Sequence, residues 1–188
     1  HAGIGLIRRI LRPGLPVYNR TLSVAEVQNR IKTYYRPYHS ALQSLLDEAH
    51  YNFGTVWHIN CHSMPSGKFS AVRSGLSIFT HEPDFVLGNR DGTTCSIDFT
   101  RETRQFLRDL GYRVAINNPY RGVELIRKYS SPSEGRHSMQ IEINKALYWD
   151  ESENRKNKKY DALKADLEKL TQFFGAYVKN NLVSLAAD

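Results

Sequence analysis

The sequence predicts an α/β domain in which a mixed, mostly parallel sheet is flanked by helices. Short β-rich runs alternate along the chain with helical patterns, which is typical of this class. Hydrophobic residues make up 40% of the chain and charged residues 24%, as in globular proteins. At 188 residues the chain is long enough for one domain with a sizeable core. We therefore expect a single domain over 1–188.

The N-terminal quarter predicts an irregular segment followed by a helix. Residues 1–21 mix glycine, proline and apolar side chains and are expected to form an irregular lead-in. Ser23 and Glu26 have the spacing of a capping box, and apolar residues then recur at helical spacing over 23–49. Pro37 lies inside this helix, where it should produce a kink or divide the helix in two.

Four short β-rich runs bounded by turn residues predict the strands of the sheet. They are 54–60, 84–88, 112–116 and 137–144, the first of them expected to be buried. The first is followed by a Ser/Gly-rich loop over 63–75, and the third by a long functional loop over 117–136 with about one helical turn.

Two further helices are expected on either side of the last strand. The first runs from 98 to 110 and ends before Gly111, a residue type favoured just after a helix. The second is a C-terminal amphipathic helix over 159–182, which follows a polar stretch.

Charge and cysteine content exclude several classes of protein. The net charge is +7, but the basic residues are dispersed and form no known nucleic-acid-binding pattern. A small anionic substrate would explain the positive charge equally well, and the charge alone does not choose between the two partners. No apolar run is long enough to cross a membrane, and no membrane association is expected. Cys61 and Cys95 are too few for a disulfide framework, which favours a reduced, cytoplasmic setting. The sequence does not specify an oligomeric state.

The best candidates for chemistry are an imidazole and a carboxylate near strand ends. His62 follows the first predicted strand, and Glu142 lies in the last one. A metal-assisted hydrolase needs a metal ligand and a general base, and these residue types can supply them. By pattern alone, His62 could equally be a hydrogen-bonded loop residue. Glu142 shares a strand face with Gln140, and a solvated face is the more common explanation of that alternation.

Three arginines and a second histidine are candidates for binding substrate. Arg90, Arg121 and Arg127 lie in predicted loops, and a guanidinium group can bind a carboxylate through two parallel hydrogen bonds. His137 begins the last strand, on the opposite face from Glu142, and could bind substrate or a loop.

Five segments, in order along the chain, resemble the N-formylglutamate amidohydrolase (N-formylglutamate deformylase) family. They are YRPYH (35–39), HSMPS (62–66), LGNRDG (87–92), NPYRGVEL (118–125) and GRHSMQIEIN with LYWDE (135–144 and 147–151). The resemblance implies a zinc-carboxypeptidase/aspartoacylase-like fold. It also implies hydrolysis of N-formyl-L-glutamate to glutamate and formate, late in histidine breakdown. His62 then corresponds to a zinc ligand and Glu142 to the residue that activates water, while Arg90, Arg121 and Arg127 could bind the substrate carboxylates.

The sequence departs from this family in two respects. Family members are longer, and the other zinc ligands are expected in an N-terminal segment that this chain lacks. The family commonly has Asp two residues before the ligand histidine, where this chain has Asn60. Two alternatives therefore stay open beside deformylation: hydrolysis of another N-acyl amino acid, and a catalytically incompetent domain that binds an anion or a partner.

Overall fold

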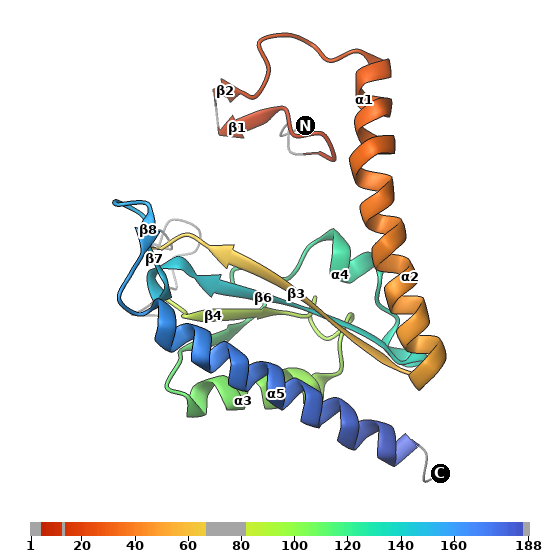
Figure 1. Cartoon of the computed structure of the whole chain (residues 1–188), viewed down its shortest axis with the longest axis vertical. Helices are drawn as coiled ribbons and strands as arrows, with labels where there is room; N and C mark the ends of the chain where they lie inside the picture. The colour runs from red at the N-terminus through yellow and green to blue at the C-terminus, as the bar shows by residue number, and fades with distance from the viewer. Residues whose placement is uncertain (1–4, 13, 67–81, 186–188) are drawn as a thin grey trace. The chain divides into compact units, whose positions relative to one another are not determined.

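The computed structural model describes residues 5–12, 14–66 and 82–185 (Figure 1). The chain divides into two compact units, residues 1–47 and 48–188, which are described separately below. The single domain expected from the sequence stays a prediction. The expected loop over 63–75 lies partly outside the described residues.

The first unit contains a small strand pair and a long helical segment. Strands β1 (Ile10–Arg12) and β2 (Leu15–Pro16) pair antiparallel within the lead-in that was expected to be irregular. Helix α1 (Val24–Arg30) begins at the predicted capping box. There the Ser23 hydroxyl accepts from the Glu26 amide, and the Glu26 carboxylate accepts from the Ser23 amide.

The disturbance expected at Pro37 takes the form of a π-helical turn. The turn η1 (Ile31–Tyr35) joins α1 to α2 (Arg36–Phe53), which continues into the second unit. The amide of Arg36 donates to the carbonyl of Ile31, five residues back. Proline lacks an amide proton, and its ring crowds the preceding turn, so one wider turn accommodates it without ending the helix.

The second unit is built on a four-stranded mixed sheet in the order β3-β6-β4-β5 (Figure 1). Strands β3 (Val56–Met64) and β6 (Arg136–Asn144) run parallel. Strand β4 (Phe85–Gly88) is antiparallel to β6 and parallel to β5 (Val114–Ile116). The predicted class, a mixed sheet flanked by helices, is confirmed.

The first strand of this sheet differs from the prediction. β3 extends four residues beyond the predicted end, through Met64, so His62 and Ser63 lie within the strand. All nine residues of β3 pair with β6. This distant partner supplies the backbone hydrogen bonds of a segment whose sequence predicted a loop. β3 is also the edge of the sheet and is mostly half-buried, so the buried strand expected there is wrong.

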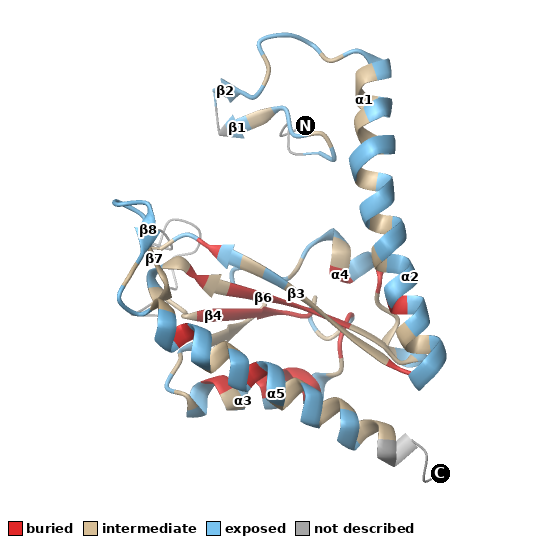
Figure 2. Cartoon of the chain, viewed as in Figure 1, coloured by how far each residue is buried: buried red, intermediate tan, exposed pale blue. Residues whose placement is uncertain are grey.

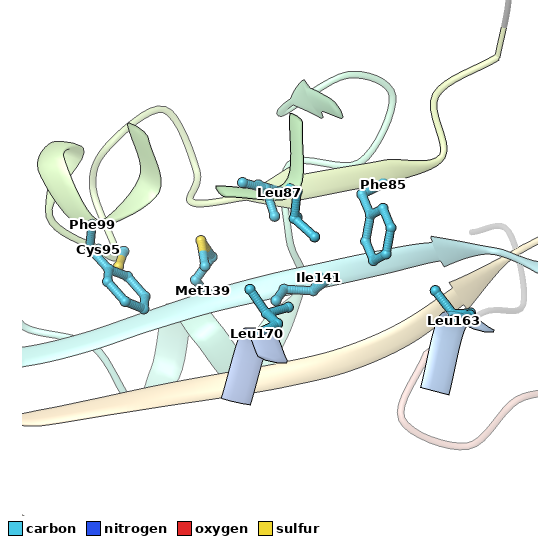
Figure 3. Packing of buried hydrophobic residues seen from close by; sticks show 9 residues of the cluster. Phe85, Leu87, Cys95, Phe99, Met139, Ile141, Leu163 and Leu170 are labelled. Atoms are coloured by element: carbon cyan, nitrogen blue, oxygen red, sulfur yellow. The ribbon is translucent and has the colours of Figure 1, made fainter. Parts of the chain in front are cut away.

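Helices α3 (Ile97–Asp109) and α5 (Tyr160–Leu185) cover one face of the sheet (Figures 1 and 2). Ser96 caps the start of α3, and Gly111 follows its end with a φ of 92°, as its predicted position after the helix requires. The apolar side chains of this face form the core (Figure 3). Its buried members are Phe85, Leu87, Cys95, Phe99, Leu107, Met139, Ile141, Leu163 and Leu170.

Short elements occupy the two segments expected to be irregular or polar. The predicted functional loop contains α4 (Glu124–Lys128) and the 3-10 turn η2 (Pro132–Glu134). After β6, the turn η3 (Lys145–Leu147) leads into a hairpin of β7 (Trp149–Asp150) and β8 (Arg155–Lys156), which the sequence did not predict. Within 5–12, 14–66 and 82–185, no helix combines the length and apolar character needed to cross a bilayer.

Candidate active site

The two faces of the β3–β6 pair have opposite chemistry. On one face, the three central pairs in register are polar on both strands: His58 with Ser138, Asn60 with Gln140 and His62 with Glu142. The residues between them face the helices, where Met139 and Ile141 join the core. Side chains of paired residues lie on the same side of a sheet, so this polar face is a single surface. It is the face opposite α3 and α5.

Glu142 and His62 are direct partners on this surface. The Glu142 carboxylate is 5% exposed, and its Oε1 lies 3.8 Å from Nδ1 of His62, whose side chain is 39% exposed. Gln140 Nε2 donates to the same Oε1 at 2.7 Å. A buried carboxylate beside a solvent-accessible imidazole is an arrangement that can bind and deprotonate a water molecule.

The tautomer of His62 follows from its contact with Asn60. The Asn60 Nδ2 atom lies 3.1 Å from Nε2 of His62 and can only donate. With the amide in this orientation, Nε2 is the acceptor and the ring proton is on Nδ1, on the side of Glu142. A metal ion bound by His62 would have to take the lone pair that faces Asn60, or the ring would have to adopt the other tautomer.

Tyr120 is a member of the site that the sequence did not single out. Burial raises the pKa of its hydroxyl, and the negative charge of Glu142 raises it further, which places Tyr120 within the electrostatic reach of Glu142. Tyr120 belongs to the segment 118–125, which resembles the family. Nothing in the sequence indicated, however, that its hydroxyl group approaches Glu142.

The segment that carries Tyr120 and Arg121 lies against the end of β4. The Arg90 amide donates to the Arg121 carbonyl at 2.9 Å, and Gly122 passes directly over Gly88. Asn89 and Asn117 exchange hydrogen bonds between the carboxyl ends of β4 and β5. Ligand sites in open α/β sheets lie outside such strand ends.

Backbone conformation is unusual at these strand ends. Arg90, Asp91 and Asn117 have φ values of 49°, 58° and 57°, in the left-handed region that side chains rarely adopt. Such conformations cluster at binding and catalytic sites, because the surrounding structure has to enforce them.

The three candidate arginines have different surroundings. Arg90 Nη1 donates to the neutral carbonyl of Gly122 at 3.1 Å. Arg121 forms an ion pair with Asp91, and Arg127 pairs with Glu124 at 2.9 Å, three residues earlier in α4. Arg127 and Glu124 are both more than half exposed, as is typical of a solvated helix pair. Arg90 is thus the candidate whose observed hydrogen bond goes to a neutral group, while its charge also acts on the nearby Glu124 carboxylate.

His137 lies apart from the other candidates. It is on the helix-covered face of β6, where its ring stacks on Trp57 with 4.9 Å between the ring centroids. Burial lowers the pKa of the imidazole. The structure therefore brings together His62 and Glu142, and it places His137 on the opposite face of the sheet.

The described residues at this site supply too few ligands for a zinc ion. In the described part of the chain, no group of three or more His, Cys, Asp or Glu side chains is arranged to hold one. His62 is accessible and can offer one imidazole nitrogen, but structural and catalytic zinc sites use three or four protein ligands. The described residues therefore do not form a zinc site by themselves.

Three comparisons relate the chain to known proteins. A family model described as N-formylglutamate amidohydrolase matches residues 1–149. The chain is 26% identical over 155 residues to an N-formylglutamate deformylase of Pseudomonas putida, covering 81% of this chain and 56% of that protein. It also matches the crystal structure of N-formylglutamate amidohydrolase from Ralstonia eutropha JMP134. That match has a TM-score of 0.89 and 43% identity, over 96% of this chain and 64% of the other. The chain thus spans less than two thirds of the length of each relative.

Proposed function

Because the chain belongs to the N-formylglutamate amidohydrolase family, we propose that it hydrolyses the formyl amide of N-formyl-L-glutamate, releasing glutamate and formate. The observation that carries the proposal is the pairing of His62 with the buried carboxylate of Glu142 on one face of the sheet. The named activity of both relatives supports the same reaction.

Glu142 is the proposed general base. It would take a proton from the attacking water and pass it to the nitrogen of the breaking amide bond, which then leaves as the amino group of glutamate. Its Oε1 accepts a hydrogen bond from Gln140 Nε2, which orients the carboxylate. Tyr120, within the electrostatic reach of this carboxylate, is placed to contact the substrate beside it.

Arg90 is the proposed partner of a substrate carboxylate. N-formyl-L-glutamate carries two negative charges, and the chain carries a net charge of +7. Arg90 would exchange its bond to a neutral carbonyl for one to a carboxylate, which is stronger. Arg121 would first have to leave Asp91, and Arg127 already pairs with Glu124.

We also propose zinc dependence, with His62 as one ligand. The remaining ligands would come from outside the described residues. A bound zinc ion would polarise the formyl oxygen and lower the pKa of water to about 7. The same proposal includes the zinc-carboxypeptidase/aspartoacylase-like fold and a cytoplasmic role in histidine breakdown.

A second candidate function is that of a catalytically incompetent domain that binds a small anion. It is favoured by the lack of a three-ligand metal group in the described residues. Arg90 would serve it equally well, because anion binding needs the guanidinium group but neither Glu142 nor a metal ion.

A substrate panel tests the proposed reaction. N-formyl-L-glutamate, N-formyl-L-aspartate and N-acetyl-L-glutamate would be compared by following the free amino acid released, with zinc supplied. We expect the highest kcat/KM for N-formyl-L-glutamate. Preference for the acetyl compound would identify a hydrolase of another N-acyl amino acid, and binding without release would identify the anion-binding domain.

The role of Arg90 can be tested in the same assay. Arg90→Ala should raise KM for N-formyl-L-glutamate by roughly 10- to 100-fold, the value of a hydrogen bond between charged groups. Arg127→Ala is the matched control, because it removes an exposed guanidinium group that is already paired with Glu124. Equal effects of the two substitutions would exclude Arg90 as the specific contact.

A further inference from the structure

Gln140 joins two parts of the site that are distant in sequence. Its side chain is 1% exposed, and its Nε2 donates to Glu142 Oε1 at 2.7 Å. Its Oε1 accepts from the backbone amide of Val123 at 3.1 Å. One buried amide therefore connects the proposed base to the residue that immediately precedes α4.

The orientation of this amide is determined by its partners. A backbone N–H can only donate, so the oxygen of the Gln140 amide must face Val123. The nitrogen must then face Glu142, and it can only donate. The contact with Glu142 therefore requires an acceptor at Oε1.

The other end of this connection belongs to residues 120–123, here called the substrate-facing segment because Tyr120, a proposed substrate contact, lies on it. Val123 is the N-cap residue of α4, and its side chain makes no capping hydrogen bond to that helix. The segment is held at Val123 by the bond to Gln140 and at Arg121 by the bond from the Arg90 amide to the Arg121 carbonyl. Both Tyr120 and Arg121 lie on this segment.

We propose that Gln140 is a positioning residue that couples the Glu142 carboxylate to the substrate-facing segment. The role in turnover rests on the proposed function, whereas the coupling itself does not. Binding of substrate by residues 120–123 would be transmitted to the base through one rigid amide. A misplacement of about 1 Å can cost on the order of 100-fold in rate, so such a connection would matter for catalysis.

Two substitutions of similar size separate the two hydrogen bonds. Gln140→Glu keeps an oxygen acceptor for Val123 but has no donor for Glu142 and places a second negative charge beside it. Gln140→Met removes both bonds. Glu142→Ala leaves Gln140 intact and removes the acceptor that orients its amide.

Amide hydrogen exchange followed by NMR tests the coupling without substrate or metal. Gln140→Met should speed the exchange of the Val123 amide by about tenfold, the value of one net hydrogen bond, while Gln140→Glu should leave it protected. Glu142→Ala should also speed it, because the freed Gln140 amide can turn away. The Asn89 amide, which bonds to the Asn117 side chain, is the internal control and should not change.

Kinetics test the role in turnover. Gln140→Glu should lower kcat for N-formyl-L-glutamate on the order of tenfold or more with little change in KM, because the base is disturbed and the segment is not. Gln140→Met should lower kcat and also raise KM. The matched control is Gln105, which donates to Asp109 at 2.7 Å on the exposed surface of α3. Gln105→Glu and Gln105→Met should change neither quantity.

The outcomes distinguish this proposal from the proposed function. Unchanged exchange at Val123 in Gln140→Met, or wild-type kcat in Gln140→Glu, would overturn the positioning role. A wild-type chain that releases no formate contradicts the proposed function, and the exchange data then decide the coupling by themselves. If Gln140→Met does not fold, the other two variants still test the coupling. The Val123 amide should exchange faster in Glu142→Ala and stay protected in Gln140→Glu, and equal exchange in the two would overturn the coupling.

Discussion

A β-carbon on Gly88 would lie 2.8 Å from the backbone nitrogen of Gly122. The two glycines are more than thirty residues apart, and their contact brings the end of β4 against the segment that carries Tyr120 and Arg121. The atoms that crowd Gly88 belong to backbone, which cannot move aside as the end of a flexible side chain can. The glycine at position 88 is therefore required by this close approach.

Gly88→Ala should lower the free energy of unfolding by about 1–3 kcal/mol, the usual cost of overpacking. Urea denaturation of wild type and variant measures this difference. The matched control is Gly175→Ala in α5, where a β-carbon would meet nothing within 4 Å. That substitution should raise stability by about 0.5–1 kcal/mol, because alanine favours a helix interior. Equal responses at the two positions would contradict the close approach.

Glu142→Gln should lower kcat by about 10²- to 10⁴-fold, the typical contribution of a general base. The replacement amide has the shape of the acid and still offers an oxygen to Gln140, so the fold and the metal content should be unchanged. Formate release and zinc content measured on the same preparation check both statements. Wild-type activity in this variant would remove Glu142 from the mechanism.

His62→Ala should abolish zinc binding if His62 is a ligand, because catalytic zinc ions are held by few protein side chains. His58→Ala is the matched control. His58 lies on the same strand face, but its Nδ1 is 2.8 Å from the Ser138 hydroxyl, and burial lowers the pKa of its ring. Elemental analysis should find zinc in the control and not in His62→Ala. Stoichiometric zinc in His62→Ala would exclude His62 as a ligand.

Asp84 should make stability depend on pH in acid. Burial raises the pKa of its carboxyl, but hydrogen bonds from the side chain and backbone of Arg113, with the charge of Arg113, outweigh burial and leave the pKa below 3.8. The stabilisation is therefore fully present above the ordinary pKa and is lost as the pH falls through the lower folded value. Because Arg113 is 52% exposed, solvent screening limits the pair. We expect it to contribute about 1 kcal/mol.

Asp84→Asn isolates this contribution. Its loss of stability relative to wild type should be about 1 kcal/mol at pH 6 and should shrink as the pH falls through the lowered pKa of the folded wild-type carboxyl. Urea denaturation across this range measures the difference. A constant difference at every pH would show that packing, and not the carboxylate charge, is responsible.

Local signals in the sequence were sufficient for most elements of the second unit. α3 begins at a serine cap and ends at a left-handed glycine, and both are short-range features. The length of β3 was not predictable, because Cys61 to Met64 become a strand only by pairing with β6, some eighty residues later. The β7–β8 hairpin lies in a polar stretch without the alternating pattern that predicts strands.

The site was predictable where strand alternation determines it. The alternation of β6 placed Gln140 and Glu142 on one face and His137 on the other, and the structure shows that arrangement. The position of Tyr120 was not predictable, since it depends on the approach of Gly122 to Gly88 across two loops. Only the partner of Arg90 is distant in sequence, the carbonyl of Gly122, whereas Arg127 pairs locally with Glu124 three residues earlier in α4.

Formate release from N-formyl-L-glutamate, measured on this 188-residue chain together with its zinc content, tests the central claim most directly. The proposed function predicts near-stoichiometric zinc and the release of one formate per glutamate. A folded chain that contains no zinc and releases no formate would contradict it, and it would favour the anion-binding domain instead.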